Sequence, residues 1–191
     1  MPNSATYVAL LRGINVGGNK PVAMPELREM LAQLGFDDVR SILQSGNLVF
    51  RSSTRVNRAL ENRLESETAA RLGLQADFLI RTAREWRTIV ARNPFRKAAE
   101  SDPAHLVVML LKTVPKADAI KAAQGAIAGR ETIRADGRQL YIVYPAGIGT
   151  SRLTNALLEK KLGTRGTARN WNTVLKLATL LDELDGPRSQ P

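Results

Sequence analysis

The stretch Thr6-Tyr7-Val8-Ala9-Leu10-Leu11-Arg12 decides how the first half of this chain folds. Its centre, residues 8–11, is apolar without a polar break, which is typical of a strand covered on both faces. A loop over 13–23 follows, and Pro25 then suits the first turn of a helix that stops at Gly35. This opening predicts a strand, a loop and a helix in that order.

The rest of the first half extends this start into a ferredoxin-like unit. The pattern predicts strands over 39–44 and 48–51 around the turn Ser45-Gly46-Asn47, a helix over 56–72, a strand over 76–81 and a trailing helix over 84–92. The order βαββαβ is that of the split βαβ fold. Pro94 ends the trailing helix, because the residue before a proline disfavours the helical region.

The second half repeats part of this order. The pattern predicts a strand over 105–112, a helix over 116–127, strands flanking the hairpin signal Asp136-Gly137, and helices over 150–162 and 170–184. It therefore reads βαββα, with a helix where a last strand would be expected. We predict an α+β protein with a ferredoxin-like βαββαβ subdomain and its trailing helix at 1–95, and a related βαββα subdomain with C-terminal helices at 104–191.

Composition limits the class of protein. The chain has 191 residues, of which 43% are hydrophobic and 24% charged, as in ordinary globular proteins. No apolar run approaches the roughly 18 residues that span a bilayer, and residues 1–6 lack the features of a signal peptide. We therefore expect a cytoplasmic protein without membrane contact. With no cysteine and one histidine, we expect no metal site.

The net charge of +10 is unevenly distributed. Residues 1–82 hold 10 basic and 8 acidic side chains, whereas residues 83–191 hold 18 and 10. A basic half suggests an anionic partner, such as nucleic acid, a nucleotide or a phosphorylated metabolite. The alternative is that the excess only reflects a basic proteome.

Two polar segments are expected to meet at one edge of the first sheet. The loop over 13–20 approaches a phosphate-binding motif but has Asn19 in place of its lysine, which leaves a donor-rich turn that can bind an anion. In the predicted strand order, Arg12 and Asn47 lie at the same edge. Asn15, Gln44, Ser45 and Asn47 would then be within reach of the same ligand, and Lys20 lies next to the turn. The alternative is a pair of turns in which glycines only supply positive φ angles.

Two further segments precede helices in the second half. In residues 145–152, glycines come before a helix that Thr150 or Ser151 would cap, and Arg152 adds charge there. This pattern predicts either ordinary capping or an anion site.

In the last of these segments, Asn170 would cap the final helix and Trp171 would pack into the core. Arg165 and Arg169 crowd the positive end of that helix, where cations are disfavoured unless an anion or a buried carboxylate lies nearby.

Catalytic groups are sparse. His105 begins an apolar strand and has no evident carboxylate partner, and no paired carboxylates or nucleophile elbow stand out. Aromatic residues for stacking on RNA bases are few, so any nucleic-acid contact is expected to be with the backbone.

Four motifs together resemble a known bacterial family. They are the opening 10–18 (LLRGINVGG), residues 44–47 (QSGN), residues 93–95 (NPF) and residues 169–173 (RNWNT). The chain is similar to the family catalogued as domain of unknown function 1697 over nearly its whole length. The resemblance implies a small bacterial protein of two α+β subdomains, and it brings no activity, cofactor or catalytic residue.

Three hypotheses for the function follow. The leading one is binding of an anionic ligand, either nucleic-acid backbone or a phosphorylated small molecule, by Arg12, Asn15, Lys20, Asn47, Arg165, Arg169 and Asn170. The second is an enzyme acting on a small anionic substrate in a cleft between the two halves. The third is a scaffold whose polar motifs only cap helices and fix turns. No motif indicates a cofactor or an oligomeric state.

Overall fold

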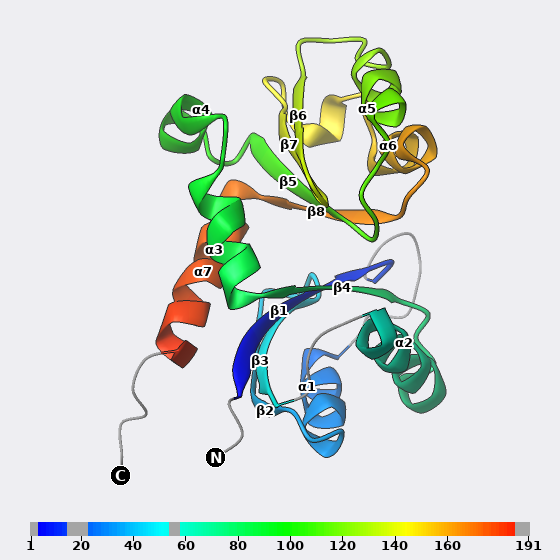
Figure 1. Ribbon diagram of the computed structural model, residues 1–191, viewed down its shortest axis with the longest axis vertical. Helices are drawn as coiled ribbons and strands as arrows, with labels where there is room; N and C mark the ends of the chain where they lie inside the picture. The colour runs from blue at the N-terminus through cyan, green and yellow to red at the C-terminus, as the bar shows by residue number, and fades with distance from the viewer. Residues whose placement is uncertain (1–3, 15–22, 54–57, 186–191) are drawn as a thin grey trace. The chain divides into compact units, whose positions relative to one another are not determined.

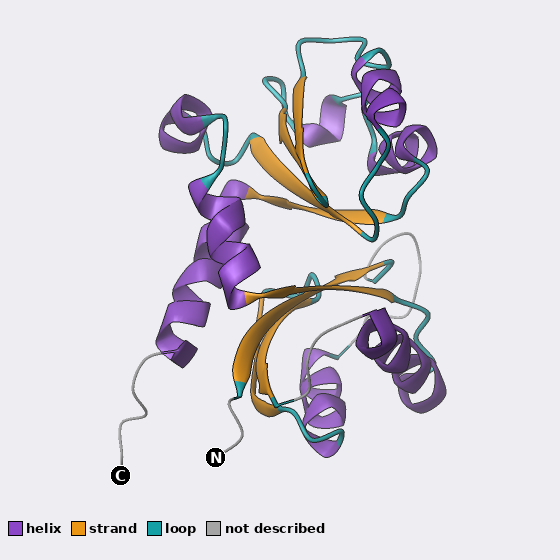
Figure 2. Cartoon of the chain, viewed as in Figure 1, coloured by secondary structure: helices purple, strands orange, loops and turns teal. Residues whose placement is uncertain are grey.

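A computed structural model describes residues 4–14, 23–53 and 58–185 of the chain. It divides into two compact units, Met1–Thr88 with Lys176–Pro191, and Ile89–Leu175. Each unit contains a four-stranded antiparallel sheet with helices on one face (Figure 1, Figure 2). The predicted α+β class with two similar subdomains is therefore confirmed. The division at 1–95 and 104–191 stays a prediction about which segments fold on their own.

The first unit follows the predicted ferredoxin-like order. Its elements are β1 (Ala5–Arg12), α1 (Met24–Gln33), β2 (Asp37–Ile42), β3 (Asn47–Ser52), α2 (Arg58–Leu72), β4 (Asp77–Thr82) and the first part of α3 (Ala83–Ala91). The strand order is β2-β3-β1-β4, so β1 and β3 are central neighbours as the sequence predicts. Leu10 is paired with Asn47, which brings the end of β1 to the start of β3.

The two faces of the first sheet are both buried, as the unbroken apolar run of β1 predicts. Tyr7, Ala9 and Leu11 point to the face where α1 and α2 contribute Leu27, Leu31 and Leu64. Residues on the other face, including Val8 and Leu10, are also fully buried. Strand alternation therefore gives β1 two apolar faces instead of one.

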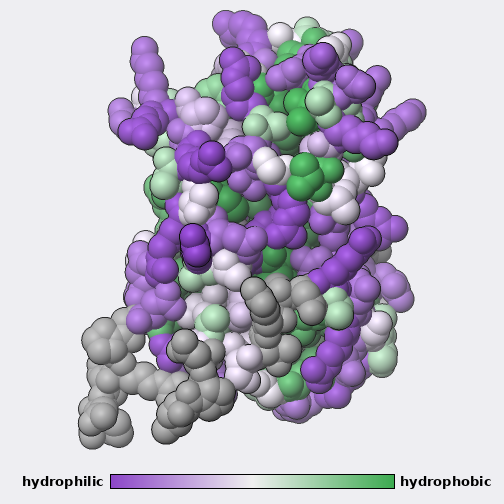
Figure 3. Space-filling view, in the orientation of Figure 1, coloured by the Kyte–Doolittle hydropathy of each residue, from purple (hydrophilic) through white to green (hydrophobic). Residues whose placement is uncertain are grey.

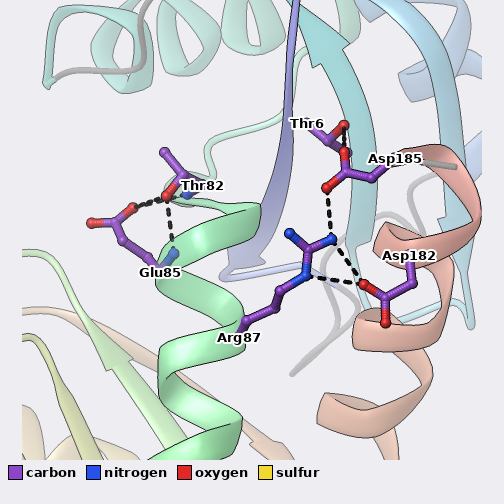
Figure 4. Close-up of polar contacts among 6 residues, drawn as sticks. All are labelled: Thr6, Thr82, Glu85, Arg87, Asp182 and Asp185. Atoms are coloured by element: carbon purple, nitrogen blue, oxygen red, sulfur yellow. Dashed lines mark hydrogen bonds and ion pairs between the residues drawn. The ribbon is translucent and has the colours of Figure 1, made fainter.

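Polar contacts join α3 to the C-terminal part of α7 (Trp171–Asp185) within the first unit. Arg87 donates to Asp182 at 2.8 Å and to Asp185 at 2.6 Å, and Asp185 accepts a hydrogen bond from the hydroxyl of Thr6 (Figure 4). At the start of α3, Thr82 and Glu85 form a reciprocal capping pair. These contacts attach the C-terminal segment to β1 and α3.

The second unit has the same sheet topology. Its elements are the end of α3, α4 (Arg96–Ser101), β5 (Leu106–Leu111), α5 (Ala117–Gln124), β6 (Thr132–Asp136), β7 (Gln139–Val143), the 3₁₀ turn η1 (Ile148–Thr150), α6 (Asn155–Leu162), β8 (Gly166–Asn170) and the start of α7. The strand order β6-β7-β5-β8 matches the first unit position for position.

Strand β8 is missing from the sequence prediction, which placed no strand between 162 and 170. The segment is short and starts with glycine, so its pattern is weak. Glycine is needed there, because a Cβ at Gly166 would lie 2.6 Å from the carbonyl oxygen of Leu110. With β8 the second unit completes the βαββαβ order that the first unit shows, and the helix α7 follows it.

Aromatic side chains of the second sheet are buried and unavailable for base stacking. Tyr141 and Tyr144 are 0% and 1% exposed, and their hydroxyls donate to the carbonyl oxygens of Ile89 and Leu153. Burial raises the pKa of each of these tyrosines to about 12. Neither tyrosine is therefore exposed for stacking on RNA bases.

Candidate functional site

A pocket of about 330 Å³ opens in the second unit. Two segments line it: residues 128–131, which lead into β6, and part of the connection from β7 to α6, namely Pro145, Ala146 and residues 150–152. The volume is at the lower end of that found for small-molecule sites. The segment 145–152, in which the sequence suggests an anion site or capping, is therefore one wall of a pocket.

Hydrogen bonds hold the connection 144–154 in shape. Gly147 donates to the carbonyl of Tyr144 at 2.9 Å, and its φ of 86° is one that glycine adopts without strain. Thr150 donates to the carbonyl of Ala146 at 2.8 Å, and Leu153 is buried in the core. The wall of the pocket is therefore fixed by the fold.

The prediction that Thr150 or Ser151 caps the following helix is wrong. Thr154, not Thr150 or Ser151, caps α6 by accepting a hydrogen bond from the backbone N–H of Leu157 at 3.2 Å. Residues 148–150 form a 3₁₀ turn instead of the first turn of α6, so the helix starts at Asn155. The polar groups of Thr150 and Ser151 thus remain at the pocket wall.

Glu131 is the acidic group of the pocket. The hydroxyl of Ser151 donates to its Oε1, and Ser151 also accepts a hydrogen bond from the N–H of Leu153 at 3.0 Å. The bond from Ser151 and the nearby backbone of Glu131 and Gly129 hold the pKa of this carboxyl below its ordinary value. It is therefore negatively charged at neutral pH. Its Oε2 is buried and accepts no hydrogen bond from the described residues.

Arg130 and Arg152 supply the positive charge. Both side chains are exposed, and neither forms an ion pair with any residue in the described part of the chain. Each adjoins a residue that holds the wall together, since Arg130 precedes Glu131 and Arg152 follows Ser151. The pocket therefore combines two cations, one carboxylate and the hydroxyls of Thr150 and Ser151.

The predicted site residues of the first unit are used within the fold. Arg12 donates to Asp77 at 3.1 Å, in an ion pair whose carboxylate is largely buried and whose guanidinium is partly exposed. Asn47 is fully buried, and its amide donates to the carbonyl of Ile42 and to Ser45, which closes the hairpin. Arg12 and Asn47 do lie at the same end of the sheet, where β1 ends and β3 begins, as predicted. Asn15 and Lys20 lie outside the described residues.

The predicted residues of the second unit lie on β8 and at the start of α7. Asn170 caps α7, because its Oδ1 accepts from the N–H of Thr173 at 3.0 Å, yet the side chain is exposed. Trp171 is 4% exposed, as expected for a core residue. Arg165 is exposed.

The side chain of Arg169 forms hydrogen bonds with neighbouring residues of its own strand, β8. It donates to the hydroxyl of Thr167 and to the carbonyl of Ala168, and burial lowers its pKa to about 10, so it stays charged at neutral pH. A role in ligand binding stays a prediction for Arg165, Arg169 and Asn170.

His105 has a carboxylate partner that the sequence analysis missed. Its Nδ1 lies 2.7 Å from Oδ2 of Asp102, and its N–H donates to the carbonyl of Asp102 across a tight turn. The signal was present in residues 102–105 (DPAH), because proline at the second position favours a turn that brings the first and fourth residues together. Both side chains are exposed, which makes this a surface pair.

Neither a metal centre nor a membrane span is evident in the described ranges. No group of three or more metal-ligating side chains occurs there, and no helix is long and apolar enough to cross a bilayer. Figure 3 shows a face covered mainly by hydrophilic side chains. Large hydrophobic side chains that are exposed, such as Leu43 and Val114, occur singly.

The fold defines an α+β protein with two similar subdomains of ferredoxin-like strand order. The chain belongs to the family described as "Protein of unknown function (DUF1697)", whose model matches residues 5–141. A solved structure of a conserved bacterial protein from Streptococcus pneumoniae is similar, with a TM-score of 0.73 and 23% identity over 93% of this chain and 99% of that one. At this identity the likeness concerns the fold. A search of curated proteins found no match.

Proposed function

We propose that this protein binds a small anionic molecule in the pocket of its second unit, with Arg130 and Arg152 as the attracting groups. The observation that carries the proposal is the position of two exposed arginines, free of ion pairs, beside a pocket of about 330 Å³. Arginine is suited to phosphate and carboxylate groups because its planar head donates two parallel hydrogen bonds.

The charge distribution supports the same unit. Residues 89–175 hold 14 basic and 6 acidic side chains, so most of the net charge of +10 falls there. The net positive charge of this unit attracts an approaching anion, and the two arginines of the pocket would then fix the position of the anion. Arg12, Asn15, Lys20 and Asn47 belong to a different unit and are not needed by this proposal.

The test is a titration of the full chain with inorganic phosphate at low salt, in which binding is measured by calorimetry or by the shift in thermal unfolding. We expect weak binding, with a Kd of about 1 mM. Arg152→Ala and Arg130→Ala should each abolish most of it. The matched control is Arg134→Ala, which removes the same charge from an exposed arginine of β6 outside the pocket. Equal losses in all three variants would contradict a site in the pocket.

Nucleic-acid backbone is the second candidate, favoured by the excess of positive charge in the second unit. Labelled single- and double-stranded nucleic acids should be titrated across a salt series by fluorescence anisotropy. A steep fall of affinity with log salt, together with similar effects of Arg134→Ala and Arg152→Ala, would favour this candidate over the pocket. No binding at low salt would remove it.

A further inference from the structure

Glu131 gives the pocket a negative charge that an anion alone would not use. Glu131 lines the pocket together with Arg130 and Arg152, yet it forms an ion pair with neither arginine. A carboxylate beside two arginines would normally form an ion pair with one of them, because each such pair is favourable. Here Ser151 holds the carboxylate away from them through its hydroxyl.

The carboxylate lies close to the backbone of residue 129. A Cβ at Gly129 would lie 2.6 Å from Oε2 of Glu131, so a side chain at 129 would displace the carboxylate from this position. Oε2 is buried and accepts no hydrogen bond from the described residues, and exceptions of this kind call for an explanation. A positive charge placed in the adjoining pocket would compensate it, since attraction acts over several ångströms in a partly buried site.

We infer that the ligand of this pocket is zwitterionic, a small soluble molecule whose anionic group is bound by Arg130 and Arg152 and whose ammonium group is attracted by Glu131. This inference rests on the proposed function and specifies its ligand class. Opposite charges at two places in one pocket select both the charge and the orientation of the ligand. A simple anion gains from the arginines and is repelled by the carboxylate.

The experiment compares two ligands with the same three-carbon chain, propyl phosphate and 3-aminopropyl phosphate, by calorimetry with the wild-type chain. We expect the amino compound to bind roughly fivefold more tightly. In Glu131→Gln, propyl phosphate should bind more tightly than to the wild type, and the preference for the amino compound should vanish. The Gln side chain retains an oxygen that can accept from Ser151.

Each outcome decides one claim. If neither phosphate binds the wild-type chain, the proposed function fails. If both bind equally, the function stands and the zwitterion inference is overturned, whether or not the Glu131→Gln variant folds. If Glu131→Gln weakens both ligands in parallel, Glu131 only supports the pocket wall, and the inference is again overturned. Opposite effects on the two ligands support it.

Discussion

The two units have one topology and differ in the connections that carry polar groups. In the first unit, β3 and α2 are joined by residues 53–57, whereas in the second the equivalent β7 and α6 are joined by residues 144–154. The longer connection builds a wall of the pocket. The connection after the first strand of each sheet is instead longer in the first unit, where it spans residues 13–23, than in the second, where it spans residues 112–116. The two units thus share one strand order and differ in which of its connections is the longer one.

Ion pairs occur in both units. In the first unit, Arg12 pairs with Asp77, Arg71 with Glu67 and Arg87 with Asp182. Other arginines of this unit are exposed and form no ion pair with the described residues, namely Arg58, Arg63 and Arg84. In the second unit, Arg92 pairs with Asp136, but Arg130 and Arg152 form no ion pair with the described residues. Unpaired arginines therefore occur in both units, and what distinguishes Arg130 and Arg152 is that they line the pocket.

The largest effects should come from the equivalent edge strands β4 and β8. Phe78 is paired with Leu11, and Gly166 is paired with Leu111 at the same position of the other sheet. Phe78→Ala should lower the free energy of unfolding by about 3–5 kcal/mol, because it empties a fully buried site. Gly166→Ala should cost about 2–3 kcal/mol for the opposite reason, since the added carbon would collide with the backbone of Leu110.

Chemical denaturation of both variants measures these losses. The result would break the comparison if Gly166→Ala were neutral, because β8 would then not lie as close to β5 as the structure has it. The wild-type chain gives the reference midpoint and slope.

A smaller difference is expected between the two hairpin glycines. Gly46 and Gly137 both have positive φ, 69° and 59°. A Cβ at Gly46 would collide with Cδ1 of Ile14 and lie 2.8 Å from Cβ of Leu11, whereas one at Gly137 meets nothing within 4 Å. Gly137→Ala should therefore cost about 1 kcal/mol from the backbone alone, and Gly46→Ala about 2 kcal/mol. Thermal unfolding of the pair checks this, and equal losses would show that Leu11 and Ile14 both move aside freely.

Much of the fold follows from local pattern, and the misses have physical causes. The unbroken run 8–11, the leucines of the helices and the turn at Gly46 are local signals, and each predicts its element correctly. Strand β8 escapes because its position depends on a glycine packed against a strand far away in sequence.

The candidate site shows the same limit. Segment 145–152 is visible from its glycines and polar residues, but Glu131 and Arg130 join it only through the packing of β6 beside β7. Asn47 illustrates the reverse error, because a turn residue that looks available for a ligand uses its amide inside the hairpin. Sequence shows which polar groups are present, whereas three-dimensional packing decides which of them face a pocket.

The smallest effect concerns the ion pairs of the first unit. Burial alone would raise the pKa of Asp185, but hydrogen bonds from Thr6 and Arg87 and the charge of Arg87 outweigh it and hold the pKa below its usual value.

A carboxyl with a lowered folded pKa stabilises the fold above its unfolded pKa of about 3.9, and the stabilisation is lost as the pH falls through the folded value. Asp185→Asn should cost about 0.5–1 kcal/mol at neutral pH and almost nothing near pH 2. Asp136→Asn, which removes the exposed pair with Arg92, is the matched control in the second unit and should change stability by less. A loss at Asp185 that persists at low pH would mean that the side chain acts through packing instead of through its charge.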